Sequence, residues 1–183
     1  MTQLKVTDLK KELKKLDQTE VIQLITDLYK LSDDVKQYLS SKFIGEEANA
    51  ILFDKAKKAI TDEFFPSRGS AKLRLNEAKK AITDFKKITG DNERTVDLML
   101  YYVEIGTEFT NAYGDIDSRF YNSMISMYGK VVVECQKYET FFLTFKDRLY
   151  KVIIDSNRIG WGYHEALCEK YYELANFMGD EME

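Results

Sequence analysis

The sequence predicts an all-α fold of about nine helices, and three observations support this class. Of the 183 residues, 44% are hydrophobic and 32% are charged, so the chain is too apolar for a disordered protein. It holds one proline and nine glycines, too few turn-forming residues for a fold of many short strands. Apolar residues recur every three or four positions along its length, which is the spacing of amphipathic helices.

Three short helices are predicted at the start of the chain. Thr7 is suited to cap the first helix, and Asp17 with Glu20 has the spacing of a capping box that opens the second. Ser32 is the expected start of the third helix, which we expect to end near Gly45.

Longer helices are predicted next. The first is expected over residues 46–63, because Pro66 disfavours helix at the residue before it. The second runs from about residue 75 to Gly90, and the third from residue 92 to residue 112. This third helix has apolar residues on two sides, so it must be covered on both and is the expected centre of the fold.

The last third of the chain continues the pattern. Gly114 suits the C-terminal end of a helix, and Asp117 or Ser118 can cap the next one. Two more helices are expected as far as residue 178, followed by a frayed tail over residues 179–183.

We expect a single domain, with short helices over residues 1–45 and three antiparallel helical hairpins over residues 46–178. Gly69, Gly114 and Gly160 recur at about 46 residues, the spacing of HEAT-like helix pairs. The hairpins therefore form either a short right-handed superhelix of the HEAT or TPR kind or a compact helical bundle. In a stack of hairpins, the three glycine-bearing loops share one edge.

Cysteine usage, hydropathy and charge narrow the class of function. Cys135 and Cys168 form no CxxC pair, no signal peptide follows Met1, and no run approaches the roughly 20 apolar residues that span a membrane. We therefore expect a cytoplasmic protein that does not bind membranes. The net charge of −4 is divided unevenly, but lysines alternate with acidic residues, so nucleic-acid binding is not expected.

The loop over residues 64–74 is the first candidate site. It carries three cations, Arg68, Lys72 and Arg74. Beside a helix N-terminus, such cations can hold a phosphate or a carboxylate. The alternative is structural: Phe64 and Phe65 fill the core while the cations stay solvated.

The loop over residues 113–119 offers two carboxylates, Asp115 and Asp117. Together with Glu104 and Glu108 on the preceding helix, they could hold a hard cation. Helix capping explains Asp117 without a ligand. We therefore expect no metal ion, and nothing in the sequence implies a cofactor.

The loop over residues 156–165 contains Trp161 and His164. His164 is the only histidine, which excludes a HExxH zinc site and a di-iron bundle. An acid–base pair with Glu165 or Asp155, or a nucleophile pair with Cys168, is the catalytic reading. The structural reading is a packing residue near a helix start, and it is the one we favour.

Several motifs resemble one known family. They are EFFPSRG at 63–69, KLRL at 72–75, EAKKAI at 77–82, LMLYYVE at 98–104, EFTN at 108–111, GDID at 114–117, FYNSM at 120–124 and GWGYHE at 160–165. The sequence resembles, over nearly its whole length, an uncharacterised bacterial family defined only as domain of unknown function 6155. The resemblance implies that the three loops belong to the family pattern, and it implies no activity.

The sequence favours a protein-interaction or regulatory module that binds another protein through the loop edge or beside the central helix. A homo-oligomer is compatible with this reading. The alternative is a small anion- or ligand-binding protein, or an enzyme, that uses the three loops. The candidate binding residues are Arg68, Lys72, Arg74, Asp115, Asp117, Trp161 and His164.

Overall fold

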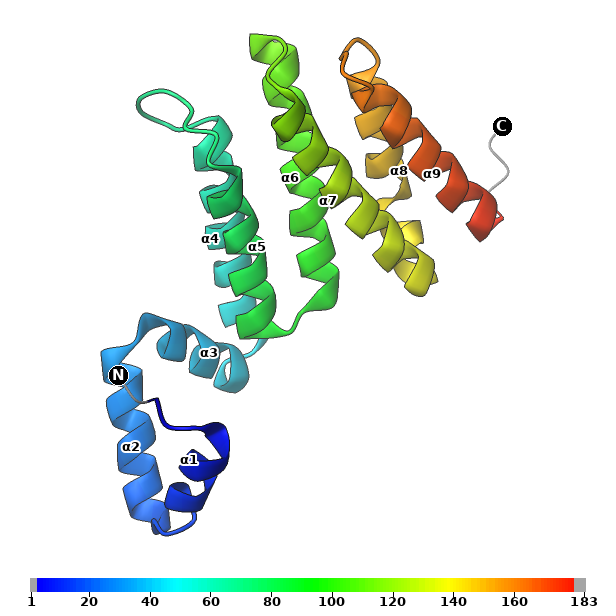
Figure 1. Ribbon diagram of the computed structural model, residues 1–183. Helices are drawn as coiled ribbons and strands as arrows, with labels where there is room; N and C mark the ends of the chain where they lie inside the picture. Colours follow the sequence, from blue (N-terminus) through cyan, green and yellow to red (C-terminus); the bar gives the residue numbers. More distant parts are fainter. Residues whose placement is uncertain (1–2, 180–183) are drawn as a thin grey trace. The chain divides into compact units, whose positions relative to one another are not determined.

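In the computed structural model, residues 3–179 are described, and they form nine α-helices and no β-strand (Figure 1). The chain divides into two compact units between Asn49 and Ala50. The N-terminal unit contains α1 (Val6–Leu13), α2 (Gln18–Leu31) and α3 (Asp33–Phe43). The second, the hairpin unit, contains most of α4 (Glu46–Phe64) and then α5 (Leu75–Thr89), α6 (Asn92–Tyr113), α7 (Ser118–Lys137), α8 (Glu139–Ser156) and α9 (Tyr163–Met178). The all-α class is confirmed.

The division between the units lies inside α4, close to the boundary expected at residue 45. That the whole chain forms a single domain stays a prediction. Of the expected tail over residues 179–183, residues 180–183 lie outside the described part of the chain.

Capping interactions define the helix starts of the N-terminal unit. The Asp17 carboxylate accepts a hydrogen bond from the Glu20 N–H at 2.8 Å, and the Glu20 carboxylate accepts one from the Asp17 N–H at 2.9 Å. This reciprocal pair is the predicted capping box. Ser32 Oγ accepts a longer hydrogen bond from the Val35 N–H at the start of α3, as expected for a cap.

The prediction that Thr7 caps the first helix is wrong. α1 begins at Val6, the residue before Thr7, and Lys5 occupies the capping position without a side-chain hydrogen bond. A capping side chain needs extended backbone at its own residue, and Thr7 already lies within the helix.

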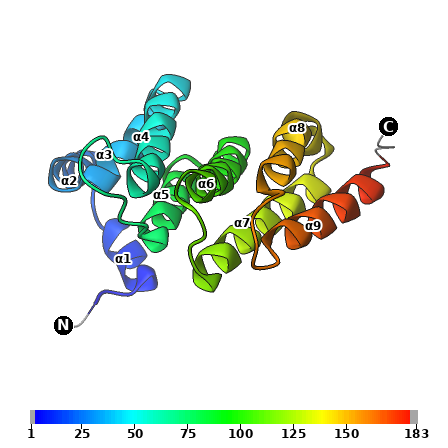
Figure 2. The same ribbon diagram turned by 90° about the horizontal axis from the view of Figure 1, so that it is seen from above.

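The hairpin unit is a stack of three antiparallel hairpins: α4 with α5, α6 with α7, and α8 with α9 (Figure 1). α6 packs against α5, α7 and α8, and α7 packs against α8 and α9. Seen from above, α4, α6 and α8 form one layer and α5, α7 and α9 form the other (Figure 2). A HEAT- or TPR-like superhelical curvature stays a prediction.

α6 is the centre of the core, as its two apolar sides predict. Eleven of its residues are buried, among them Leu100 on one side and Tyr102 on the other. Helices of both layers cover these two sides, because α5 and α7 lie in one layer and α8 lies beside α6 in the other. Burying a side chain of this size contributes about 1.5–3 kcal/mol, so α6 carries a large part of the stability of this unit.

A partly buried arginine joins α8 to α6. Arg148 donates two hydrogen bonds of 2.8 Å to the Glu104 carboxylate and one of 2.7 Å to Asp97. Burial alone would lower the pKa of Arg148, but the hydrogen bonds that it donates to these two carboxylates outweigh this effect and raise the pKa. Because both carboxylates come from α6, the arginine fixes the position of α8 along it.

Candidate interaction site

The three loops between the helices of each hairpin lie along one edge of the hairpin unit (Figure 1). Phe65 of the first loop contacts Tyr113 at the end of α6, with ring centroids 6.1 Å apart. Trp161 of the third loop stacks on Tyr121, in the first turn of α7, at 6.3 Å. The shared loop edge predicted from the glycine spacing is therefore present.

A carboxylate at the end of α4 closes the first loop. Glu63 is buried, and its carboxylate accepts hydrogen bonds from Arg74 Nη2 at 2.7 Å, from Arg74 Nε at 3.1 Å and from the Arg74 N–H at 3.1 Å. Its backbone carbonyl also accepts from the N–H groups of Lys72 and Leu73. The hydrogen bond from the Arg74 side chain lowers the pKa of Glu63 against the opposing effect of burial. The Arg74 guanidinium is therefore engaged within the fold.

The burial of its side chains supports the structural interpretation of this loop. Phe64 is almost completely buried and Phe65 is half-buried, whereas Arg68 and Lys72 are exposed. The phenylalanines therefore fill the core while these two cations face solvent.

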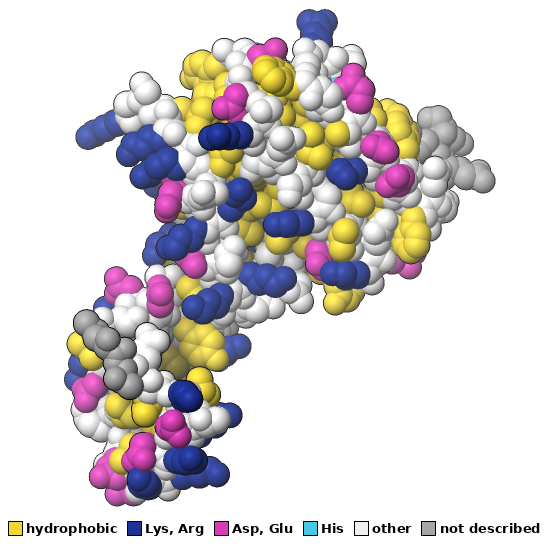
Figure 3. Space-filling view, in the orientation of Figure 1, with side chains coloured by type: hydrophobic (Ala, Val, Ile, Leu, Met, Phe, Trp, Pro, Cys, Tyr) yellow, Lys and Arg dark blue, Asp and Glu magenta, His cyan; other side chains and the backbone are white. Residues whose placement is uncertain are grey.

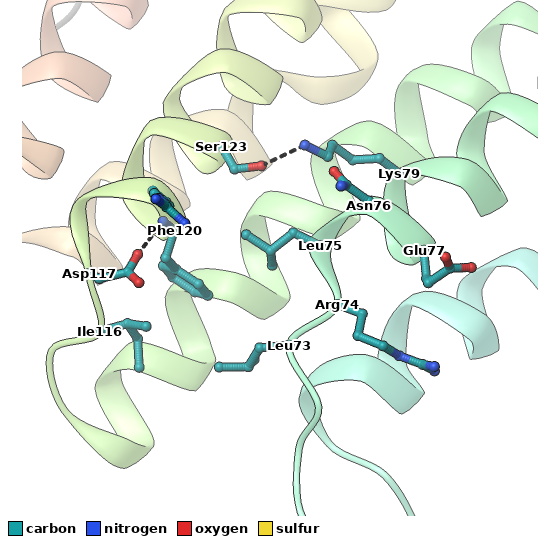
Figure 4. A pocket seen from close by; sticks show the side chains of 11 residues that line it. Leu73, Arg74, Leu75, Asn76, Glu77, Lys79, Ile116, Asp117, Phe120 and Ser123 are labelled. Carbon is teal, nitrogen blue, oxygen red and sulfur yellow. Dashed lines mark hydrogen bonds between the residues drawn. The ribbon is translucent and has the colours of Figure 1, made fainter.

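An open pocket of about 660 Å³ lies between the first turns of α5 and α7 (Figure 4). Its apolar part is formed by Leu73, Leu75, Ile116 and Phe120. Its polar part is formed by Arg74, Asn76, Glu77, Lys79, Asp117, Arg119 and Ser123. Apolar side chains flanked by both charge signs are typical of a site that receives an apolar side chain of a polar segment.

Two side chains that line the pocket belong to a hydrogen-bonded chain that ends on the buried Tyr102. Lys79 Nζ donates to Ser123 Oγ at 3.2 Å, and Ser123 Oγ lies 2.9 Å from the hydroxyl of Tyr102. Tyr102 is fully buried, and this burial raises its pKa to about 12, so the hydroxyl stays protonated. The buried phenol thus fixes the serine, which in turn orients the lysine across the space between α5 and α7.

The two aspartates of the second loop have structural partners. Asp117 accepts a hydrogen bond from the Phe120 N–H at 2.8 Å and so caps α7, as predicted. Asp115 accepts one from the Tyr121 hydroxyl at 3.1 Å. Glu104, the other carboxylate considered for a cation, is bound by Arg148. Among residues 3–179, no group of three or more histidine, cysteine or acidic side chains is placed to hold a metal ion.

Trp161 is displayed by a strained turn. Its φ is +63°, in the left-handed region that tryptophan rarely adopts, and Gly160 and Gly162 stand on either side of it. The side chain is 59% exposed although one face lies on Tyr121. Strain of this kind persists where the surrounding structure holds it, and it concentrates at functional sites.

His164 lies in a small cluster that lacks the features of a nucleophile site. Its Nδ1 is 3.0 Å from Ser156 Oγ, and its Nε2 is 3.5 Å from Cys168 Sγ. Ser156 has no exposure to solvent and donates its hydroxyl to the Ile153 carbonyl. Burial raises the pKa of Cys168, which favours the thiol over the reactive thiolate. These contacts support the packing reading of His164.

The structure divides the candidate residues among several places. Arg74 and Asp117 line the pocket, while Asp115 and Trp161 both contact Tyr121. Arg68 lies in the exposed part of the first loop, together with Lys72. His164 belongs to its own cluster. Neither Arg68 nor His164 lines the pocket, so the candidates do not form one closed ligand site.

Sequence reasoning missed most of the pocket. Lys79 lies one turn into α5, and Arg119, Phe120 and Ser123 lie in the first turns of α7. A signal was available: if hairpin loops share an edge, the first turns of the second helix in each hairpin also lie at that edge. Applied to α5 and α7, this rule would have selected these residues.

Within residues 3–179, no helix combines the length and the apolar character that a membrane span requires. No curated protein and no solved structure matches the chain. A family model described as "Family of unknown function (DUF6155)" matches residues 4–173, which include all three loops and the whole pocket. The chain therefore belongs to the DUF6155 family.

Proposed function

We propose that this protein is a protein-interaction module that binds a segment of a partner in the pocket between α5 and α7. The observation that carries the proposal is the pocket itself, which is open, has an apolar part and is flanked by both charge signs. Trp161 lies on Tyr121, whose ring contacts that of the pocket residue Phe120, and it offers an exposed aromatic anchor at the same loop edge. Tryptophan, tyrosine and arginine are enriched among the residues that dominate binding energy.

The surface around the pocket supports a polar partner segment. α5 and α7 carry seven Lys and Arg against three Asp and Glu, a net charge of +4. Dark blue cationic side chains are spread over the face of the hairpin unit that Figure 3 shows. Such a surface attracts an acidic segment and speeds its association, more than it adds to affinity.

The alternative function, a small-ligand protein or an enzyme, has weaker support. A catalytic site needs a nucleophile, a base and a stabilising group within hydrogen-bond reach of one point. Here Arg74 is engaged by Glu63, Asp117 caps α7, and His164 contacts a buried serine.

We propose the cytoplasm as the compartment, in line with cysteines that are not disulfide-bonded.

The test is quantitative co-purification from a native host with the full chain as bait. Lys79→Glu/Arg119→Glu reverses two charges at the pocket, and Trp161→Ala removes the exposed anchor. Lys55→Glu and Phe177→Ala are the matched controls, because they alter an exposed lysine of α4 and an exposed aromatic residue of α9. We expect a partner that is retained by both controls and lost at least fivefold with each pocket-edge variant.

A partner bound equally by all four variants would contradict the proposal. A thermal-shift screen with nucleotides, phosphates, divalent metals and polyamines tests the alternative. A shift in the wild type that disappears in Arg68→Ala would favour small-ligand binding through the first loop.

A further inference from the structure

The N-terminal unit has a wide apolar surface and almost no core. No residue of α1 or α2 is buried, and α3 buries one serine. Leu31 is 82% exposed and Phe43 is 84% exposed. Among residues 3–49, thirteen large hydrophobic residues are exposed: Leu4, Val6, Leu9, Leu16, Ile22, Leu24, Ile25, Leu28, Tyr29, Leu31, Tyr38, Phe43 and Ile44.

Six of these residues lie on two helical stripes. On α2, Leu24, Ile25 and Leu28 lie on one side, while Gln23 and Lys30 lie on the other. On α1, the apolar residues fall on a similar stripe, Val6, Leu9 and Leu13, which continues to Leu16 beyond the helix end. Helices with such stripes are stable when the stripes are covered.

The size of this surface requires a partner of substantial area. A half-exposed large side chain leaves on the order of 100 Å² uncovered, so the six exposed residues on the two stripes leave roughly 600 Å² of apolar surface. Since a little over half of an interface is apolar, these stripes with their polar borders make up roughly 1,000 Å². The largest apolar patch of a typical monomer is about 300–600 Å², and a stable interface buries about 800 Å² on each partner. The exposed area is thus sufficient for a stable dimer.

The charge pattern selects the partner. Residues 3–16 hold five Lys against two acidic residues, whereas residues 17–45 hold three Lys against five. On the helical wheel, Lys10 borders the apolar stripe of α1 with Lys14 beyond it, Glu12 borders the other side, and Glu20 and Asp27 border one side of the stripe of α2. In a two-fold dimer each contact occurs twice with the roles exchanged, so a surface with one basic and one acidic part is complementary to itself.

We propose that the N-terminal units of two copies of this chain pair through their apolar stripes, with α1 of each copy against α2 of the other. This arrangement covers both stripes and places Lys10 and Lys14 beside Glu20 and Asp27. It does not depend on the pocket or on its partner, because no residue of the N-terminal unit lines the pocket.

The first experiment measures the oligomeric state of the full chain by sedimentation equilibrium. We expect a dimer for the wild type at about 10 μM and a loss of affinity of at least a hundredfold in Ile25→Glu/Leu28→Glu, which places charge in the stripe of α2. Leu143→Glu/Ile154→Glu is the matched control, because it alters two exposed apolar residues of α8. It should stay dimeric, with circular dichroism confirming that both variants are helical.

A second arm tests which helices pair. Lys10→Glu/Lys14→Glu should weaken the dimer about tenfold, and adding Asp27→Lys should restore part of the affinity, because the reversed charges then face a reversed partner while the capping box of Glu20 stays intact. A wild type that is monomeric up to about 100 μM would overturn the proposal, since the stripes would then be covered by another protein or by the same chain. A dimer that only the α8 variant disrupts, or charge reversals that do not rescue one another, would also overturn it.

Discussion

α2 in the N-terminal unit and α6 in the hairpin unit both have wide apolar surfaces, yet none of the residues of α2 is buried whereas eleven of α6 are. The number of neighbouring helices explains this difference in burial. α6 has neighbours on both sides within its own stack, while the N-terminal unit has too few residues to build a core of its own. Apolar periodicity therefore predicts that a helix will be covered, but not what will cover it.

The two units are also stabilised by different kinds of interaction. The hairpin unit is held by buried side chains and by partly buried ion pairs such as that of Arg148. The N-terminal unit is held by local interactions along each helix, such as the capping box of Asp17 and Glu20. Changes of the same kind should therefore have different effects in the two units.

The largest expected difference concerns one leucine in each unit. Leu100→Ala removes a fully buried side chain and should lower the free energy of unfolding by about 3 kcal/mol, because it leaves a cavity. Leu28→Ala removes a side chain that is 44% exposed and should cost less than about 0.5 kcal/mol. Urea unfolding followed by circular dichroism measures both, at a protein concentration low enough to dissociate a dimer.

An equal loss of stability in the two variants would contradict the difference in burial between α2 and α6. It would show that Leu28 is buried by the same chain in solution, and the apolar stripe of α2 would no longer need a second copy.

Helix boundaries and the loop edge could be predicted because they depend on local chemistry. Gly90 adopts a left-handed conformation at the end of α5, and Asp117 caps α7, as their residue types indicate. The even spacing of three glycines predicted loops on one side. Each of these inferences needs only residues that are close in sequence or a repeated interval.

The pocket and its contacts could not be predicted in the same way. The bond between Glu63 and Arg74 joins residues eleven apart across an irregular loop, and nothing in the spacing indicates it. The contact between Lys79 and Ser123 depends on the lateral distance between α5 and α7, which core packing sets. The strained backbone of Trp161 is likewise a result of the surrounding structure.

The next largest effect compares two ion pairs. Arg148→Met should lower the free energy of unfolding by about 2 kcal/mol, because it leaves Asp97 and Glu104 without their cation in a partly buried position. Lys36→Met in the N-terminal unit breaks an exposed pair with Asp33 and should cost less than about 0.5 kcal/mol. Thermal unfolding of both variants at low salt checks the difference.

A smaller effect follows from the pKa of Glu63, which lies below its ordinary value in the folded chain. Its carboxylate therefore stabilises the fold above the unfolded pKa, roughly 4.3, and this contribution is lost as the pH falls through the lower folded value. Glu63→Gln should lower the free energy of unfolding by about 1–2 kcal/mol at pH 7, because the groups that donate hydrogen bonds to Glu63 lose a charged partner. The difference in the free energy of unfolding between the variant and the wild type should shrink as the pH is lowered below about 4.

Glu12→Gln is the matched control in the N-terminal unit. Glu12 pairs with Lys15 at 2.8 Å, but both side chains are exposed. Chemical unfolding measured over a series of pH values should show no such decrease in the difference between this variant and the wild type. A cost of Glu63→Gln that stays constant down to pH 3 would mean that the ionised form does not contribute through Arg74.

The smallest expected effect compares one helix cap in each unit. Asp17→Ala and Asp117→Ala each remove a capping side chain, and each should lower the free energy of unfolding by about 1 kcal/mol. Hydrogen exchange should distinguish them. At a protein concentration low enough to dissociate a dimer, exchange in α2 should accelerate along the whole helix, because α2 buries no residue and little besides local interactions then holds it. In α7, acceleration should be confined to the first turn, because buried residues such as Met124 and Tyr128 hold the rest against α6 and α9. Acceleration confined to the first turn of α2 as well would show that its apolar stripe is covered, and the pairing partner would then be sought by repeating the exchange across a range of protein concentrations.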